Sequence, residues 1–122
     1  MVTTATSLGR NGVQDWLIQR ISAVVLLLYV LFLTVYIAQA DELTFIQWRG
    51  LFGQTWMRVF TLAALVSLLA HAWIGLWTIT TDYLTRMALG AAAAPIRLFA
   101  QLLILLVLIC YFAWCVQILW SI

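Results

Sequence analysis

Lysine is absent from this sequence, and histidine and proline each occur only once. Charged residues make up 8% of the 122 positions, against about 25% in an average soluble domain. The six basic residues are all arginines and form no run, so a net charge of +2 does not indicate nucleic-acid binding. Hydrophobic residues make up 66% of the chain, which excludes an ordinary soluble domain and indicates an integral membrane protein.

Three apolar segments are each long enough to cross a bilayer as a helix, which takes about 20 residues. We expect spans at about 18–40, 57–82 and 95–120. Pro95 suits the first turn of the third helix, where its missing N–H costs no hydrogen bond. Because backbone groups in hydrocarbon must be satisfied internally, the predicted fold class is all-α, with residues 1–122 forming a single membrane-anchor domain.

The distribution of arginines predicts the orientation in the membrane. They lie as Arg10 and Arg20 before the first span, Arg49 and Arg58 in the first loop, and Arg86 and Arg97 around the second loop. Two acidic residues offset the first-loop pair, and the C-terminal end has no basic residue. The positive-inside rule therefore places the N-terminus in the cytoplasm and the C-terminus on the periplasmic side. The first 20 residues are polar, so we expect no cleaved signal peptide.

The single histidine, His71, lies in the middle of the second span, in the segment LLAHAWIGLWTITTDYL. At about 100° per residue, small and polar residues share its face of the helix. They are Ala64, Ser67, His71, Gly75, Thr78 and Asp82. The opposite face carries the large apolar residues Leu65, Leu69, Trp73, Leu76 and Trp77.

Two interpretations of His71 are open at this point. Small residues allow close helix packing, with one hydrogen bond from His71 to a neighbouring helix. Alternatively, ionisable residues inside a span are usually functional, and neutral imidazole beside the open space at Gly75 is a good axial ligand for haem iron. Met57 and Met87 lie too far away to ligate the same iron, so a six-coordinate haem requires a ligand from a partner subunit.

Asp82 and Tyr83 follow His71 by about 16–18 Å along the helix axis, which places them at the membrane boundary. Tyrosines gather at that boundary, and Asp82 can pair with Arg86 four residues later. The functional alternative is a quinone head-group site, in which a phenol donates a hydrogen bond to a quinone carbonyl and a carboxylate tunes that phenol.

Residues for independent catalysis are missing. The chain has no phosphate-binding loop and no nucleophile–base pair. Cys110 and Cys115 are five residues apart and point in different directions on a helix, so we expect neither a disulfide nor a metal site between them. The chain is therefore expected to work as part of a larger assembly or in transport.

Four features resemble one known family over nearly the whole chain: LGRNGVQDWLIQR, the apolar span after it, ELTFIQW in a short loop, and HAWIGLWTITTDYL. The family is that of the small hydrophobic membrane-anchor subunits of bacterial succinate dehydrogenases (complex II). The resemblance implies a multi-pass protein of the inner membrane, packed with a second three-helix cytochrome b anchor. An iron–sulfur subunit and an FAD-containing flavoprotein subunit would lie on the cytoplasmic face.

The same resemblance implies roles for individual residues. His71 would be an axial ligand of a haem b shared with the second anchor, and Tyr83 would donate a hydrogen bond to ubiquinone, with Asp82 beside it. Arg20 is a candidate to balance the charge of a haem propionate, or simply a positive-inside anchor. Relatives often have histidine where this chain has Gln14, which puts a propionate role at that position in doubt.

Three alternatives to a succinate dehydrogenase anchor stay open on sequence. The nearest is the anchor of a quinol:fumarate reductase, which runs the reverse reaction. A small transporter or channel subunit would favour several charged residues facing a pore, whereas these spans offer essentially one histidine. The third alternative is a scaffold without haem.

Overall fold

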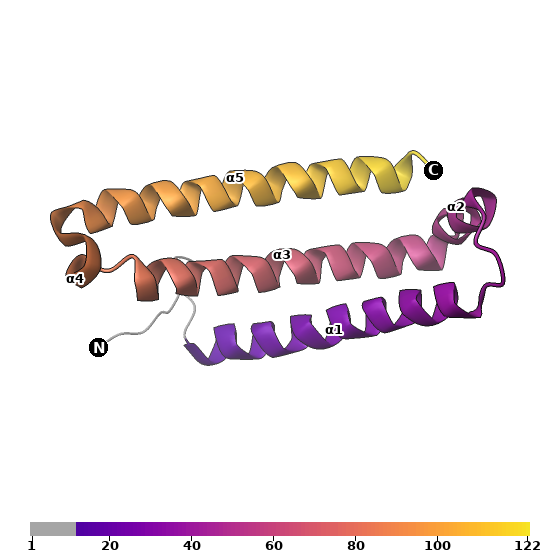
Figure 1. Ribbon diagram of the computed structural model, residues 1–122, viewed down its shortest axis with the longest axis horizontal. Helices are drawn as coiled ribbons and strands as arrows, with labels where there is room; N and C mark the ends of the chain where they lie inside the picture. Colours follow the sequence, from indigo (N-terminus) through magenta and orange to yellow (C-terminus); the bar gives the residue numbers. More distant parts are fainter. Residues whose placement is uncertain (1–11) are drawn as a thin grey trace.

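The computed structural model describes residues 12–122, which form three long helices lying side by side (Figure 1). The elements are α1 (Gly12–Gln39), α2 (Phe45–Gly53), α3 (Thr55–Tyr83), α4 (Arg86–Leu89), the 3-10 turn η1 (Gly90–Ala92) and α5 (Ala93–Trp120). The long helices are apolar enough to cross a membrane, so the expected all-helical class with three long apolar helices is confirmed. Arg10, which contributes to the predicted orientation, lies outside the described residues.

The helix boundaries differ from the expected spans mainly at the start of α1, which begins at Gly12 rather than near residue 18. Its 28 residues correspond to a length of about 42 Å, more than the ~30 Å of hydrocarbon, so its ends reach the polar boundary. Pro95 is the third residue of α5 and lies in its first turn, where the sequence places it.

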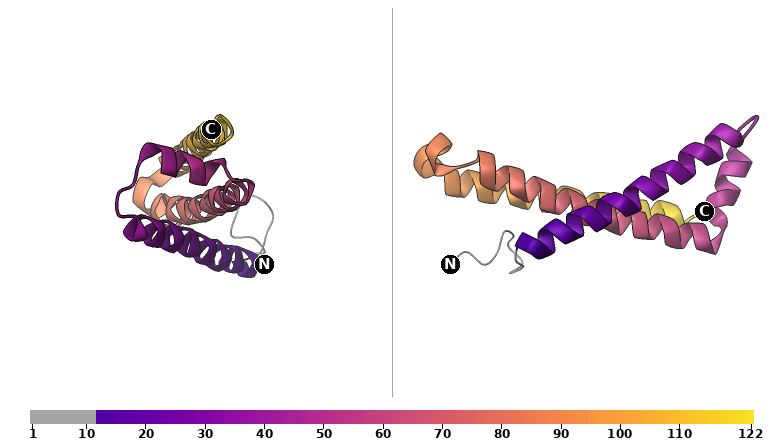
Figure 2. Two further views of the ribbon diagram at one scale, coloured as in Figure 1. Left: turned by 90° about the vertical axis from the view of Figure 1, so that its right-hand side faces the viewer. Right: turned by 90° about the horizontal axis from the view of Figure 1, so that it is seen from below.

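Helix α3 is the central element, because it packs against both α1 and α5. The two outer helices lie on opposite sides of it, and α1 crosses it obliquely (Figure 2). This open arrangement covers few side chains. The residues buried in the described part of the chain are Leu51, Met57, Ala64, Ile74, Ala93, Leu119, Asp15, Ser22 and Thr80.

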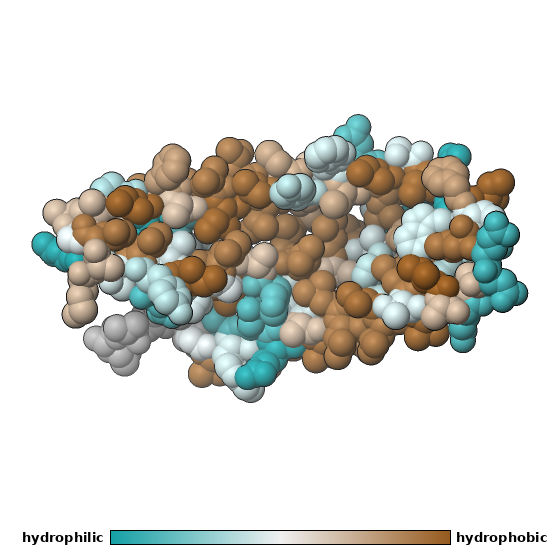
Figure 3. All heavy atoms as spheres, viewed as in Figure 1, coloured by the Kyte–Doolittle hydropathy of each residue, from teal (hydrophilic) through white to brown (hydrophobic). Residues whose placement is uncertain are grey.

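Most of the visible surface is apolar (Figure 3). Leu28 in α1 and Leu106 and Trp114 in α5 are each more than half exposed. Apolar side chains are favourable in contact with the lipid of a bilayer, whereas their exposure to water costs free energy. The exposed surface is therefore suited to lipid and to the helices of another subunit.

The first connection is not the simple loop that the sequence suggested, because it contains α2. Its N-terminus has a capping box: Thr44 Oγ1 accepts from Gln47 N at 3.2 Å, and Gln47 Oε1 accepts from Thr44 N at 3.4 Å. These two reciprocal bonds satisfy backbone donors that a short helix would otherwise leave open. The second connection turns at Gly90, whose φ of 65° is readily adopted only by glycine.

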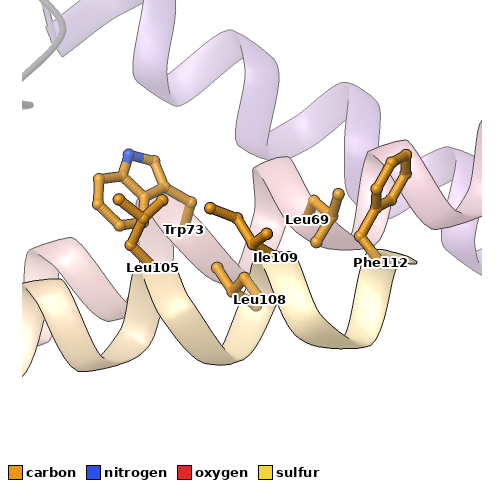
Figure 4. A pocket seen from close by; sticks show the side chains of 6 residues that line it. All are labelled: Leu69, Trp73, Leu105, Leu108, Ile109 and Phe112. Carbon is orange, nitrogen blue, oxygen red and sulfur yellow. The ribbon is translucent and has the colours of Figure 1, made fainter. Parts of the chain in front are cut away.

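The large apolar face of α3 packs against α5, as its residue pattern suggests. Leu69 and Trp73 face Leu105, Leu108 and other α5 side chains across an apolar groove of about 190 Å³ (Figure 4). One polar contact joins the same two helices, since Gln101 Nε2 donates to Thr80 Oγ1 at 3.0 Å. Both cysteines, Cys110 and Cys115, are free and exposed on α5.

Candidate functional site

His71 lies half-buried in α3, and its small, polar face is turned toward α1. The Nδ1 atom is 3.2 Å from the hydroxyl oxygen of Ser22, which is buried in α1. Ser22 in turn donates to the backbone carbonyl of Gln19 at 3.0 Å. Within residues 12–122, the second ring nitrogen of His71, Nε2, has no hydrogen-bond partner.

Two further contacts fix the register of α1 against α3. The hydroxyls of Tyr29 and Thr61 are 2.9 Å apart, and the Tyr29 and Phe60 rings meet edge to face at 5.0 Å. Both contacts lie toward the α2 end of the helix pair. Together with the Ser22 contact they set which side of the His71 ring faces α1.

The space expected beside His71 at Gly75 is partly occupied. A Cβ atom added at Gly75 would lie 3.4 Å from Nε2 of Gln19, so the Gln19 amide lies over the glycine. Its oxygen, Oε1, is buried and has no hydrogen-bond partner in the described part of the chain. The glycine therefore admits a polar side chain from α1 rather than leaving an open gap.

A cavity of about 430 Å³ begins one helical turn beyond His71, between the start of α1 and the second half of α3. Its walls include Gln19 and Arg20 from α1 and Gly75 and Thr78 from α3; His71 itself does not line it. Arg20 is exposed, and its guanidinium carbon lies 5.4 Å from the centre of the Trp16 ring. The cavity wall thus carries the cationic Arg20, the neutral amide of Gln19 and the acidic residue Asp15, about one turn from the imidazole.

Asp82 and Tyr83 occupy the last turn of α3 and are both exposed. The Tyr83 side chain is 72% exposed, and neither residue makes a side-chain hydrogen bond within residues 12–122. The helix ends before Arg86, which begins α4, and no ion pair joins Asp82 to Arg86. Asp82 and Arg86 therefore do not lie on one continuous helix, and the interfacial alternative for Asp82 stays a prediction.

Ser22 and Gln19 were not among the predicted site residues, because the first span reads as uniformly apolar in its hydropathy. A signal was present: Asp15, Ser22 and Tyr29 are spaced by seven residues. That spacing keeps side chains on one face of a helix, and this face meets α3. Gln14 lies in the first turn of α1 and is exposed.

The polar groups at this site restrict the kind of ligand that it can bind. Residues 12–122 contain no group of three His, Cys, Asp or Glu residues able to hold a metal ion. The site instead offers a single imidazole, which is sufficient for one axial position of a haem. A short distance away it offers a cation, and at the end of α3 it offers a phenol beside a carboxylate.

Three apolar helices that enclose one imidazole and several polar groups between two of them define a multi-pass membrane protein with a polar site inside the membrane. A family model described as succinate dehydrogenase/fumarate reductase transmembrane subunit matches residues 2–113. A succinate dehydrogenase hydrophobic membrane anchor subunit from Coxiella burnetii is 40% identical over 111 residues, covering 91% of this chain and 90% of the relative.

The chain therefore belongs to the family of succinate dehydrogenase/fumarate reductase transmembrane subunits. This membership confirms the resemblance drawn from the sequence and makes the chain a membrane-anchor subunit of a complex of the succinate dehydrogenase type. It also sets aside the transporter and channel alternatives. The protein is thus a subunit of an enzyme complex.

Proposed function

We propose that this chain anchors a succinate dehydrogenase to the bacterial inner membrane and supplies part of two sites within it. His71 would be one axial ligand of a haem b, and Tyr83 and Asp82 would form part of the ubiquinone-reduction site. The observation that supports the haem role best is the state of His71: Nδ1 is held by Ser22, and Nε2 has no partner within residues 12–122.

The second axial ligand must come from another chain, because this one has a single histidine. Among the described residues, Met57 and Met87 do not provide it. Met57 is fully buried at the start of α3, about 21 Å from His71 along the helix. Met87 is 98% exposed beyond the end of α3. A second cytochrome b anchor that shares the haem would supply the ligand and would cover part of the exposed apolar surface.

The cavity beside Gly75 supports a position for the haem propionates. A propionate is an anion, and Arg20 on the cavity wall carries a permanent positive charge. The Gln19 amide adds a neutral polar group, which suits a carboxylate better than an apolar wall does. When bound, haem supplies a one-electron redox centre; the residues of this chain hold it, orient it and balance its charge.

The end of α3 supports the quinone role. Ubiquinone is soluble in lipid, and its reduction to ubiquinol takes two electrons and two protons. A site at the membrane boundary receives the quinone from the bilayer and the protons from water. Tyr83, exposed and without a protein hydrogen bond in the described residues, is free to donate to a quinone carbonyl. Asp82 beside it is placed to relay protons.

The partners follow from this arrangement. Electrons would come from an iron–sulfur subunit, which receives them from an FAD-containing flavoprotein subunit that oxidises succinate. Both would lie on the cytoplasmic side, next to the Tyr83 end of α3. The positive-inside rule supports that side for this end, since Arg86 and Arg97 flank the second connection.

The experiment that tests the proposal is an absorption and EPR spectrum of the purified complex carrying His71→Ala. We expect loss of the low-spin haem signal and weaker association of the subunits. Ser67→Ala is the matched control, because Ser67 lies about one turn from His71 on the same face and its hydroxyl makes no hydrogen bond within residues 12–122. A low-spin spectrum unchanged in His71→Ala would overturn the assignment.

The family also includes fumarate reductases, so the direction of catalysis is tested separately. Rates of succinate oxidation by ubiquinone are compared with rates of fumarate reduction by a low-potential quinol in the same complex. We expect the first to be faster, and a dominant second rate would assign the chain to a quinol:fumarate reductase. A complex that contains no haem in the unmodified protein would identify the chain as a scaffold.

A further inference from the structure

Three groups form a continuous hydrogen-bonded chain from α3 into the backbone of α1. They are His71 Nδ1, the hydroxyl of Ser22, and the carbonyl oxygen of Gln19, with separations of 3.2 Å and 3.0 Å. Ser22 is 4% exposed, so water does not compete for its hydroxyl within this contact.

Only one arrangement of protons satisfies both contacts. The Ser22 hydroxyl has one hydrogen, and a carbonyl oxygen can only accept. Ser22 therefore donates to Gln19, as serines in helices often do to a preceding carbonyl. Its oxygen must then accept from His71, so the imidazole proton lies on Nδ1. The lone pair of the neutral ring is consequently on Nε2, the nitrogen with no hydrogen-bond partner within residues 12–122.

We infer that Ser22 is a positioning residue for haem: it holds His71 in the Nδ1–H tautomer and directs Nε2 to the iron. This inference rests on the proposed role of His71 as an axial ligand. Metal-bound histidines commonly donate their other N–H to a fixed acceptor, which orients the ring and makes it a stronger donor to the metal. Here the acceptor is itself polarised by its bond to the Gln19 carbonyl.

The physical consequence is a preference for ferric iron. An imidazole whose Nδ1–H is held by an acceptor donates more charge to the metal and stabilises its higher oxidation state. Removing the Ser22 hydroxyl should weaken this preference by up to about tenfold, which raises the haem midpoint potential by ~59 mV for one electron.

The test uses the purified complex with Ser22→Ala, Ser22→Thr and Thr61→Val in this chain. Ser22→Thr keeps the hydroxyl. Thr61→Val removes a hydroxyl pair between the same two helices, about 15 Å from His71, and controls for a general loosening of α1 from α3. Haem content, the ferric EPR signal and the midpoint potential are measured for each variant, with His71→Ala alongside.

We expect Ser22→Ala to raise the potential and shift the EPR signal, while Ser22→Thr and Thr61→Val match the unmodified complex. If His71→Ala loses its low-spin haem but Ser22→Ala keeps both the potential and the EPR signal, the role of Ser22 is refuted and that of His71 stands. If His71→Ala keeps its low-spin haem, both proposals fail. Should Ser22→Ala not assemble, Ser22→Cys retains a weaker acceptor; an intermediate potential supports the inference, and an unchanged one refutes it.

Discussion

Substituting phenylalanine for Tyr83 removes one hydroxyl from the end of α3 and leaves the ring in place. The side chain is 72% exposed and makes no hydrogen bond within residues 12–122, so the fold should lose no stability. A hydrogen bond to a neutral quinone carbonyl contributes about 0.5–1.5 kcal/mol, which corresponds to a loss of roughly 2- to 13-fold in kcat/KM for ubiquinone. A phenol that also passes a proton would contribute roughly 10²- to 10⁴-fold instead.

The assay compares two electron acceptors in the same purified complex. We expect Tyr83→Phe to reduce the succinate:ubiquinone rate and to leave succinate oxidation by an artificial dye unchanged, because the dye accepts electrons before the quinone site. Tyr111→Phe is the matched control, since Tyr111 is 60% exposed and lies about 27 Å along α5 from its start. Equal loss with both acceptors, or no loss with either, would refute the quinone role of Tyr83.

Two further substitutions test the surroundings of the site. Gly75→Leu should displace the Gln19 amide and fill the adjoining cavity, which should lower the haem content per complex by about tenfold. Gly75→Ala, whose Cβ would lie 3.4 Å from Gln19 Nε2, is the control and should retain haem. Equal haem contents in the two variants would show that the glycine is not needed for space. Thr80→Val removes the bond from Gln101 and should destabilise the complex by about 0.6–1.7 kcal/mol in thermal unfolding. An altered ratio of quinone to dye activity in Thr80→Val would contradict its purely structural role.

The three long helices could be predicted because hydrocarbon imposes a length and a composition that few other structures share. The polar face around His71 could also be predicted, since helical periodicity fixes which side chains point the same way. Periodicity does not say which neighbour a face meets. The sequence suggested open space beside Gly75, whereas α1 brings Gln19 there. Such a contact depends on the register between α1 and α3, which meet at Ser22 and His71, two residues separated by 49 positions in the sequence.

Helix α2 and the role of Ser22 could not be predicted from mean hydropathy. Helix α2 has a local signal, Thr44 followed three residues later by Gln47, but it lies in a stretch too short to stand out as a span. Ser22 is a single hydroxyl within a strongly apolar run, so its effect on mean hydropathy is small. Its significance depends on the position of His71 across the interface, and only the packed helices reveal that.

The polar contacts between helices differ between the two helix pairs. Those near His71 join α1 to α3. Helix α5 meets α3 through an apolar groove and the Gln101–Thr80 bond, and Arg58 of α3 donates to the Ile122 carbonyl just beyond the end of α5. Ser22 satisfies only one of the two imidazole nitrogens. A polar atom left without a partner in hydrocarbon costs up to several kilocalories per mole, so under the proposed haem role the isolated anchor would be less stable than the assembled one. A ligand that binds this nitrogen in the folded state alone stabilises that state by mass action. Under the proposed role of His71, haem binding and assembly of the complex would be linked through this residue, and subunit association should strengthen as haem is supplied.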